Sequence, residues 1–169
     1  LCGLNEQELL EEEAYWKDYA GRHIPRPYPG IRELLEEQRR RGGLITVVSH
    51  SFSDNIRRDY AAGGLPEPDQ IYGWEYPADQ RKPSPWPLQK IMETPGLPAE
   101  ALLVVDDLKP GYDMAQAAGV PFAAAGWAND IPEIESFMRS NSPLYFKTVE
   151  ALYRHLFEDK PLSAPLRSD

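Results

Sequence analysis

The sequence predicts an α/β fold in which a parallel sheet is covered by helices on both faces. Two observations carry this prediction. Short apolar segments rich in β-branched residues alternate along most of the chain with segments of helical periodicity, and strands that alternate with helices form βαβ units. The apolar segments, such as 44–49 and 101–105, are nearly continuous, which is typical of parallel strands buried on both faces.

The beginning of the chain is organised differently from the rest. Residues 6–19 place apolar and aromatic side chains at helical spacing opposite a strongly acidic face, which predicts a helix. Residues 22–30 contain three prolines and a glycine, so a linker follows this helix. We therefore divide the chain into a segment 1–27, an α/β core 28–158 and a loose, Pro/Ser-rich tail 159–169.

The core begins with a helix over residues 31–41, which has a basic last turn and is stopped by two glycines. Strands are then predicted at 44–49, 69–73, 101–105, 121–126 and 144–147. Helices are predicted between and after them, at 53–64, 84–92, 111–119, 130–138 and 148–156. The side chains expected to cap these helices are Ser53 or Asp54, Ser84 (ahead of Pro85 at the first helical position), Asp130 and Thr148.

Composition and charge exclude several classes of function. The chain has 18 basic and 27 acidic residues and a net charge of -9, so its surface repels nucleic-acid phosphates. Its single cysteine, Cys2, allows neither an intrachain disulfide nor a thiolate metal cluster. No apolar run of the sequence approaches membrane-spanning length. We expect a cytoplasmic protein that binds neither nucleic acid nor membrane; the sequence gives no indication of its oligomeric state.

Chemically active side chains gather at predicted strand ends, where parallel α/β sheets bind their ligands. Ser49 and His50 stand at the end of one strand, Asp106 and Asp107 at the end of another, and Lys82 lies in a loop between them. Taken singly, each has a plainer alternative. A serine there often caps a turn or helix, and a lone lysine is usually a solvated charge. An aspartate pair is about as often a helix cap as a metal site.

Together these groups predict most of a phosphoryl-transfer site. A hydroxyl and nearby backbone amides can bind phosphate oxygens, and a lysine can neutralise developing charge. Two adjacent carboxylates repel each other unless a cation joins them, and oxygen-only ligands suit Mg²⁺. Such a site lacks only a nucleophile.

Three segments resemble motifs of the haloacid dehalogenase (HAD) superfamily, in the order in which that superfamily has them. LITVVSHS resembles the second motif, RKPSPWPLQKI the third, and LLVVDDLKPGYDMAQAAGVPF the fourth, which ends a strand in an acidic pair. Gly111 fits the (E/D)DxxxG form of the fourth motif, whereas Asp113 then falls in a helix and is interpreted as structural. The resemblance covers residues 28–157 and is strongest for the phosphoglycolate-phosphatase-like branch.

This resemblance implies a Rossmann-like core and a Mg²⁺-dependent phosphatase. The substrate would be a small phosphorylated metabolite, processed through an aspartyl-phosphate intermediate. By position in the motifs, Ser49 and the backbone amide of His50 would hold the phosphoryl group, and Lys82 would pair with nucleophile and phosphate. Asp107 would bind Mg²⁺ directly, and Asp106 would assist through water.

One family motif is not found in the sequence. No strand ending in DxDx(T/V), which carries the nucleophile in the middle of the family's sheet, precedes Ser49. Asp18 is the best-placed early aspartate, but it lies in the predicted helix at 6–19, which resembles the second half of a small helical cap. We therefore expect a truncated chain, whose 169 residues alone are catalytically inactive and marginally folded.

Three other functions fit less well. A response-regulator receiver domain has its acidic pair on the first strand and its lysine last, unlike the order here. A non-catalytic HAD-like module that binds a ligand or partner would also lack the first motif, but it has no physical need for Ser49, Lys82 and both aspartates together. A haloacid dehalogenase ranks third. Its substrate is a carboxylate and it needs no metal, so the Asp106–Asp107 pair favours phosphate chemistry.

Overall fold

The computed structural model describes residues 3, 5–93 and 96–158, so Cys2 and the tail 159–169 lie outside the described residues. The helices of this part of the chain are α1 (Glu6–Arg22), α2 (Ile31–Arg40), α3 (Ser53–Ala62), α4 (Trp86–Glu93), α5 (Lys109–Ala118), α6 (Pro132–Asn141) and α7 (Val149–Phe157). Its strands are β1 (Thr46–Val48), β2 (Gln70–Tyr72), β3 (Val104–Asp106), β4 (Phe122–Ala125) and β5 (Leu144–Phe146). The short 3₁₀ helices η1 (Ala78–Gln80) and η2 (Ala99–Ala101) precede α4 and β3. Each predicted helix and strand is present, with ends shifted by a few residues.

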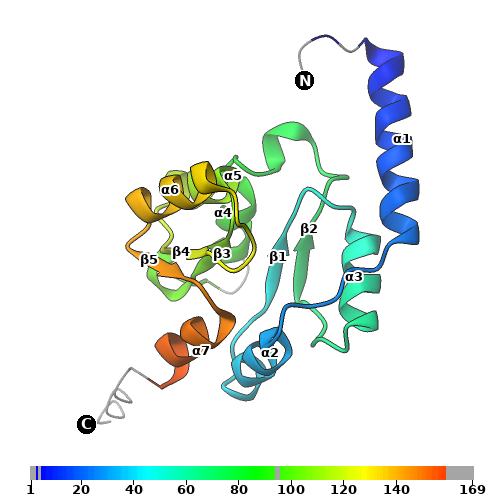
Figure 1. Cartoon of the computed structure of the whole chain (residues 1–169). Helices are drawn as coiled ribbons and strands as arrows, with labels where there is room; N and C mark the ends of the chain where they lie inside the picture. The colour runs from blue at the N-terminus through cyan, green and yellow to red at the C-terminus, as the bar shows by residue number, and fades with distance from the viewer. Residues whose placement is uncertain (1–2, 4, 94–95, 159–169) are drawn as a thin grey trace.

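All these strands pair in parallel, which confirms the predicted fold class, but they form two sheets. β1 pairs with β2, and β4 pairs with β3 on one side and β5 on the other. Among the described residues no strand joins β1 to β3, which Figure 1 shows as the neighbouring strands of the two sheets. The sheet is therefore divided, and one edge of β1 and one edge of β3 have no described partner strand.

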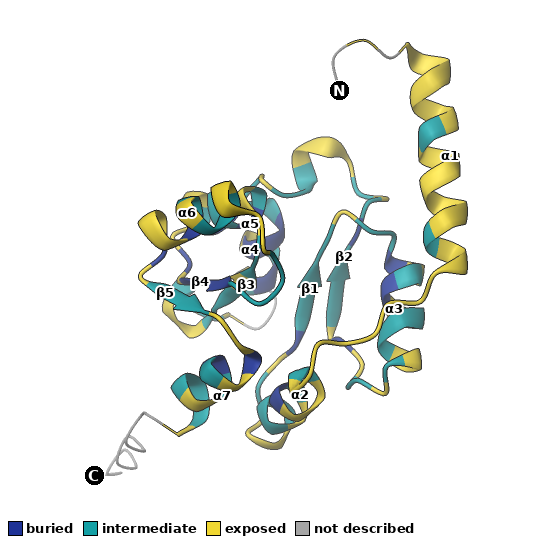
Figure 2. Ribbon diagram, viewed as in Figure 1, coloured by how far each residue is buried: buried dark blue, intermediate teal, exposed yellow. Residues whose placement is uncertain are grey.

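Helices cover both faces of the three-stranded sheet. On one face α4, α5 and α6 bury a cluster that includes Leu88, Met114 and Met138. On the other face α2 and α7 pack Leu34 against Leu152. All four residues of β4, the central strand, are buried, as Figure 2 shows. This part of the molecule holds most of the hydrophobic core and fixes where β3 ends.

The two-stranded sheet is less well covered. All residues of β1 and β2 are only half-buried. Leu44, just before β1, is 45% exposed, and Val105 in the middle of β3 is 41% exposed. Over the strand predicted at 44–49, Ile45 is 5% exposed and β1 is half-buried, so its faces are covered only in part. The edge of β1 towards β3 has no described neighbouring strand.

Helix α1 stands at the side of the molecule and none of its residues is buried (Figure 2). A capping box starts it: the Asn5 side chain accepts from the Glu8 N–H, and the Glu8 carboxylate accepts from the Asn5 N–H. Arg58 of α3 ties down its last turn by donating to the carbonyls of Ala20 and Gly21, at 2.8 and 2.7 Å. Neither α1 nor any other described helix is long and apolar enough to cross a membrane.

Two predicted caps have the expected contacts. The Thr148 hydroxyl accepts the Ala151 N–H at 3.1 Å and starts α7. The Ser84 hydroxyl accepts the Trp86 N–H at 3.3 Å ahead of α4. The helix begins at Trp86 rather than Pro85, a shift within the ordinary uncertainty of helix ends.

The other two predicted caps are wrong. Ser53 is the first residue of α3, and its hydroxyl donates to the Glu75 carboxylate instead of capping its own helix. Neither it nor Asp54 caps α3, whose N-cap position is Phe52. Helix α6 begins at Pro132, and its N-cap position is Ile131 and not Asp130. No side chain caps this helix. A tertiary partner overrides the local turn at the first helix, and the loop after β4 sets the start of the second.

Candidate active site at the ends of the strands

Lys82 and Asp106 form the best-buried ion pair at the strand ends. Asp106 is the last residue of β3, and Lys82 lies in the loop between η1 and α4. Lys82 Nζ lies 2.7 Å from Asp106 Oδ2, and the two side chains are 14% and 11% exposed. Asp106 Oδ1 accepts the Leu108 N–H at 2.9 Å. Both carboxylate oxygens of Asp106 are thus occupied by protein donors.

The loop after β1 brings Ser49 and His50 to the same end of the molecule. The Ser49 N–H donates to the Tyr72 carbonyl at 2.9 Å, and its hydroxyl accepts the Ser51 N–H at 3.1 Å. The His50 imidazole Nε2 lies 2.8 Å from the carbonyl oxygen of Lys82. Ser49 is therefore linked to the Lys82 loop through His50. Among the described interactions, none joins the Ser49 hydroxyl to Lys82 or to either aspartate.

The ring of His50 makes contacts that were not predicted, because the family motif involves only the backbone amide at this position. The ring packs edge-on against Trp74, with centroids 5.8 Å apart. The Arg81 guanidinium lies 3.8 Å from the centre of the same Trp74 ring. No spacing in the sequence pairs these residues, because they come from three separate loops.

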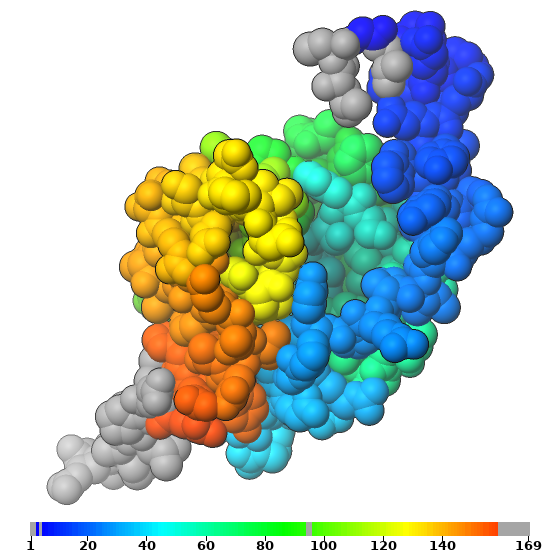
Figure 3. All heavy atoms as spheres, in the orientation of Figure 1, coloured from blue at the N-terminus to red at the C-terminus, as the bar shows by residue number. Residues whose placement is uncertain are grey.

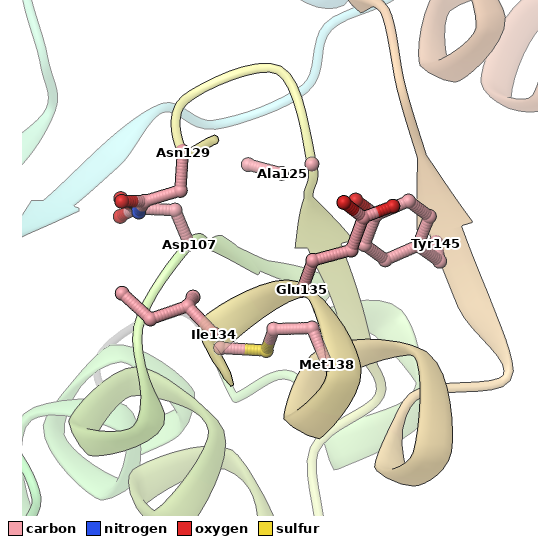
Figure 4. A pocket seen from close by; sticks show the side chains of 8 residues that line it. Asp107, Ala125, Asn129, Ile134, Glu135, Met138 and Tyr145 are labelled. Carbon is pink, nitrogen blue, oxygen red and sulfur yellow. The ribbon is translucent and has the colours of Figure 1, made fainter. Parts of the chain in front are cut away.

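Asp107 follows Asp106 and lies in a half-buried environment. Burial raises the pKa of its carboxyl group, and the neighbouring negative charge of Asp106 raises it further. The Asn129 amide Nδ2 lies 2.5 Å from Asp107 Oδ2, and Figure 4 shows the two side chains pointing towards one another. Asn129 was not predicted, although it stands in the loop after β4, where the strand-end rule also applies.

Gly111 explains how closely α5 approaches the site. A Cβ atom added at this position would lie 2.3 Å from the Asp106 Cγ atom, so only glycine fits beneath the carboxylate. Asp113, in contrast, pairs with Lys109 on the same helix, in line with its interpretation as structural. The glycine of the fourth motif is therefore required in this chain by the close packing of α5 against Asp106.

The donor set is compatible with a magnesium ion. No group of three or more His, Cys, Asp or Glu side chains that could hold a metal occurs in the part of the chain that the structure describes. Mg²⁺ keeps several waters and commonly binds through one or two carboxylates together with substrate phosphates. Asp107, whose charge is disfavoured by burial and by Asp106, fits a cation ligand better than Asp106, whose oxygens are already engaged.

Of two hollows in the described structure, one lies beside these residues and one lies away from them. The cavity beside Asp107 and Asn129 measures ≈ 10 Å³, room for about one water molecule (Figure 4). A larger hollow of ≈ 320 Å³ lies beside α3, around Tyr60 and Leu65. It contains none of the predicted site residues. Figure 3 shows a face of the molecule on which the segment after β4, in yellow, and the β1 and α3 region, in cyan and teal, are both visible.

The sequence of this chain matches a family of known proteins. The family model described as haloacid dehalogenase-like hydrolase matches residues 4–125, a range that contains all five predicted site residues. The chain belongs to the haloacid dehalogenase-like hydrolase family. It is 30% identical over 131 residues to a phosphoglycolate phosphatase of Pseudomonas savastanoi pv. phaseolicola, a match that covers 72% of this chain and 46% of that protein. The chain spans about half the length of such curated relatives.

Two solved structures share the fold of this chain. The crystal structure of CbbY from Rhodobacter sphaeroides in complex with xylulose-(1,5)bisphosphate superposes with a TM-score of 0.69 at 18% identity, covering 87% of this chain and 67% of that one. A HAD-superfamily hydrolase of subfamily IA from Geobacter sulfurreducens gives a TM-score of 0.58 at 22% identity, covering 76% of this chain and 55% of that one. At these identities the similarity establishes the fold.

Proposed function

We propose that this chain is part of a Mg²⁺-dependent phosphatase acting on a small phosphorylated metabolite, with phosphoglycolate as the first candidate. The observation that carries the proposal is the Lys82–Asp106 pair, whose side chains are 14% and 11% exposed and which stands beside Asp107 at the end of β3. The loop of Ser49 and His50 is tied to the same lysine loop. The curated relatives are phosphoglycolate phosphatases, which supports the choice of substrate.

Each residue has a chemical role in this proposal. The Ser49 hydroxyl and the His50 amide bind phosphoryl oxygens, and the Lys82 ammonium offsets their charge in the transition state. Asp107 would hold Mg²⁺ directly and Asp106 through water, and the ion, when bound, would neutralise charge on the phosphoryl group. The substrate P–O bond breaks as a nucleophilic aspartate attacks phosphorus, and the leaving oxygen takes up a proton from water and departs as the alcohol. Water then hydrolyses the acyl phosphate, which regenerates the aspartate and releases phosphate.

The nucleophile is proposed to come from a strand that is not among these 169 residues. The edges of β1 and β3 without a described partner strand, and the 41% exposure of Val105 in a parallel sheet, support a further parallel strand between them. The last residues of such a strand would lie level with Ser49 and Asp106. In the resemblance drawn from the sequence, this is where the DxDx(T/V) motif belongs.

A non-catalytic binding module is the second candidate. One observation favours it. In the described part of the chain the Lys82 ammonium contacts Asp106, which is predicted to assist the metal, and it contacts no separate aspartate that could act as nucleophile. The two candidates differ in whether the full-length gene product turns over substrate.

The test begins with the coding DNA upstream of the Leu1 codon, which gives the full-length protein, followed by assay of that protein with 2-phosphoglycolate. We expect phosphate release that needs Mg²⁺, is abolished by EDTA, and falls roughly 10²- to 10³-fold in Lys82→Ala. Lys147→Ala, which removes a 65% exposed lysine, is the matched control and should retain full activity. The 169-residue chain alone should be inactive. Turnover in EDTA, or turnover in Lys82→Ala as fast as in Lys147→Ala, would overturn the proposal.

A further inference from the structure

The loop after β4 is fixed in place before it reaches Asn129. It turns at once, with the Ala128 N–H donating to the Ala125 carbonyl at 3.1 Å. Gly126 lies against the ring of Tyr145 in β5, where a Cβ atom would be 2.3 Å from the ring carbon Cζ. Because this turn is seated on β5, the position of Asn129 is set by the neighbouring strand and not by the loop alone.

Asn129 makes its side-chain contact with the predicted metal ligand. Its amide Nδ2 lies 2.5 Å from Asp107 Oδ2, and both residues are half-buried. Hydrogen bonds from a donor to an ionised carboxylate are among the stronger ones in proteins, and more so where water is partly excluded. The contact joins the end of β3 to the loop after β4, so it restricts rotation of the Asp107 carboxylate.

The two aspartates differ in how their oxygens are used. Asp106 directs one oxygen to Lys82 and the other to the Leu108 N–H. At Asp107, the contact from Asn129 is made to Oδ2. The Asn129 amide group therefore acts on Asp107 as a hydrogen-bond donor, because its nitrogen carries two N–H groups and no lone pair for a cation.

We propose that Asn129 is a positioning residue for the metal site: its amide donates to Asp107 Oδ2 and so fixes the orientation in which the Asp107 carboxylate meets a divalent cation. The inference rests on the proposed function, which assigns Asp107 as the direct ligand. Outer groups that hydrogen-bond a metal ligand typically contribute a 10- to 100-fold effect on metal affinity. Loss of the Asn129 donor is therefore expected to weaken cation binding about 10-fold or more.

The experiment measures Mn²⁺ binding to the full-length protein by electron paramagnetic resonance of the free ion, with Mg²⁺ as competitor. Two variants remove the donor in different ways: Asn129→Leu keeps the volume of the side chain and Asn129→Ala does not. A residue that only fills space would tolerate leucine, so the inference requires that both variants weaken Mn²⁺ binding about 10-fold or more. Circular dichroism checks that each variant is folded.

Two controls separate this inference from the proposed function. Asn141→Ala removes a similar amide hydrogen bond, 2.7 Å to the Phe137 carbonyl at the end of α6, and should bind Mn²⁺ as the unchanged protein does. Asp107→Asn should abolish binding. If Asp107→Asn is silent, the metal site itself is wrong. If Asp107→Asn abolishes binding while Asn129→Leu binds Mn²⁺ normally, only the role of Asn129 is overturned.

Discussion

Replacing Lys82 by methionine is expected to destabilise the protein by about 3 kcal/mol, because Asp106 would keep a mostly buried charge without its cation. At an effective dielectric constant near 20, two unit charges 2.7 Å apart attract by about 6 kcal/mol. Desolvation of the lysine offsets part of this. Removing one partner of a fully buried pair costs roughly 3–5 kcal/mol, and exposures of 14% and 11% place this pair near the lower end.

The measurement is urea unfolding of the full-length protein, arranged as a double-mutant cycle with Asp106→Asn. Asparagine keeps an oxygen that can accept the Leu108 N–H, so the cycle isolates the ion pair. The double variant should lose about 2 kcal/mol less than the sum of the two single changes. Lys147→Met serves as control: its pair with Glu135 has side chains 65% and 34% exposed, so the change should stay within about 0.5 kcal/mol.

The reasoning is refuted if Lys82→Met destabilises the protein no more than Lys147→Met does. That result would mean that the pair is solvated in solution and that the end of β3 is open to water. An additive cycle would likewise show that Lys82 and Asp106 do not interact.

Three further predictions concern packing and pH. Gly111→Ala should lower stability by about 1–3 kcal/mol in thermal unfolding, because the new methyl group would overlap Asp106; an unchanged melting temperature would contradict that contact. Leu152→Ala, at a side chain 1% exposed, should cost about 2–5 kcal/mol by urea unfolding, and a smaller loss would mean that the core around α7 is loosely packed. Hydrogen bonds from Arg40 and Arg41 lower the pKa of Glu37 from 4.5 to about 2. The ionised Glu37 therefore contributes its full stabilisation above pH 4.5, and this stabilisation is lost as the pH falls towards 2. In acid titrations over that range, Glu37→Gln should therefore show a shallower loss of stability than the unchanged protein, and equal slopes would contradict it.

Much of the local structure could be predicted from sequence patterns, because helix and strand signals act over a few neighbouring residues. The alternation of apolar segments with helical periodicity located each strand, and the Thr148 cap is a contact between residues three apart. The same patterns failed at Ser53, whose hydroxyl bonds to Glu75, 22 residues along the chain. Local propensity has no information about a partner at that distance.

The candidate site divides in the same way. The sequence by itself determined which residues stand at the strand ends, because these residues directly end or follow the apolar segments that form the strands. Only the tertiary structure decided which of them touch: Lys82 with Asp106, the His50 ring with the Lys82 carbonyl, and Asp107 with Asn129. These contacts depend on how loops from different strands are placed by packing of the core, a property of the whole fold that no short segment carries.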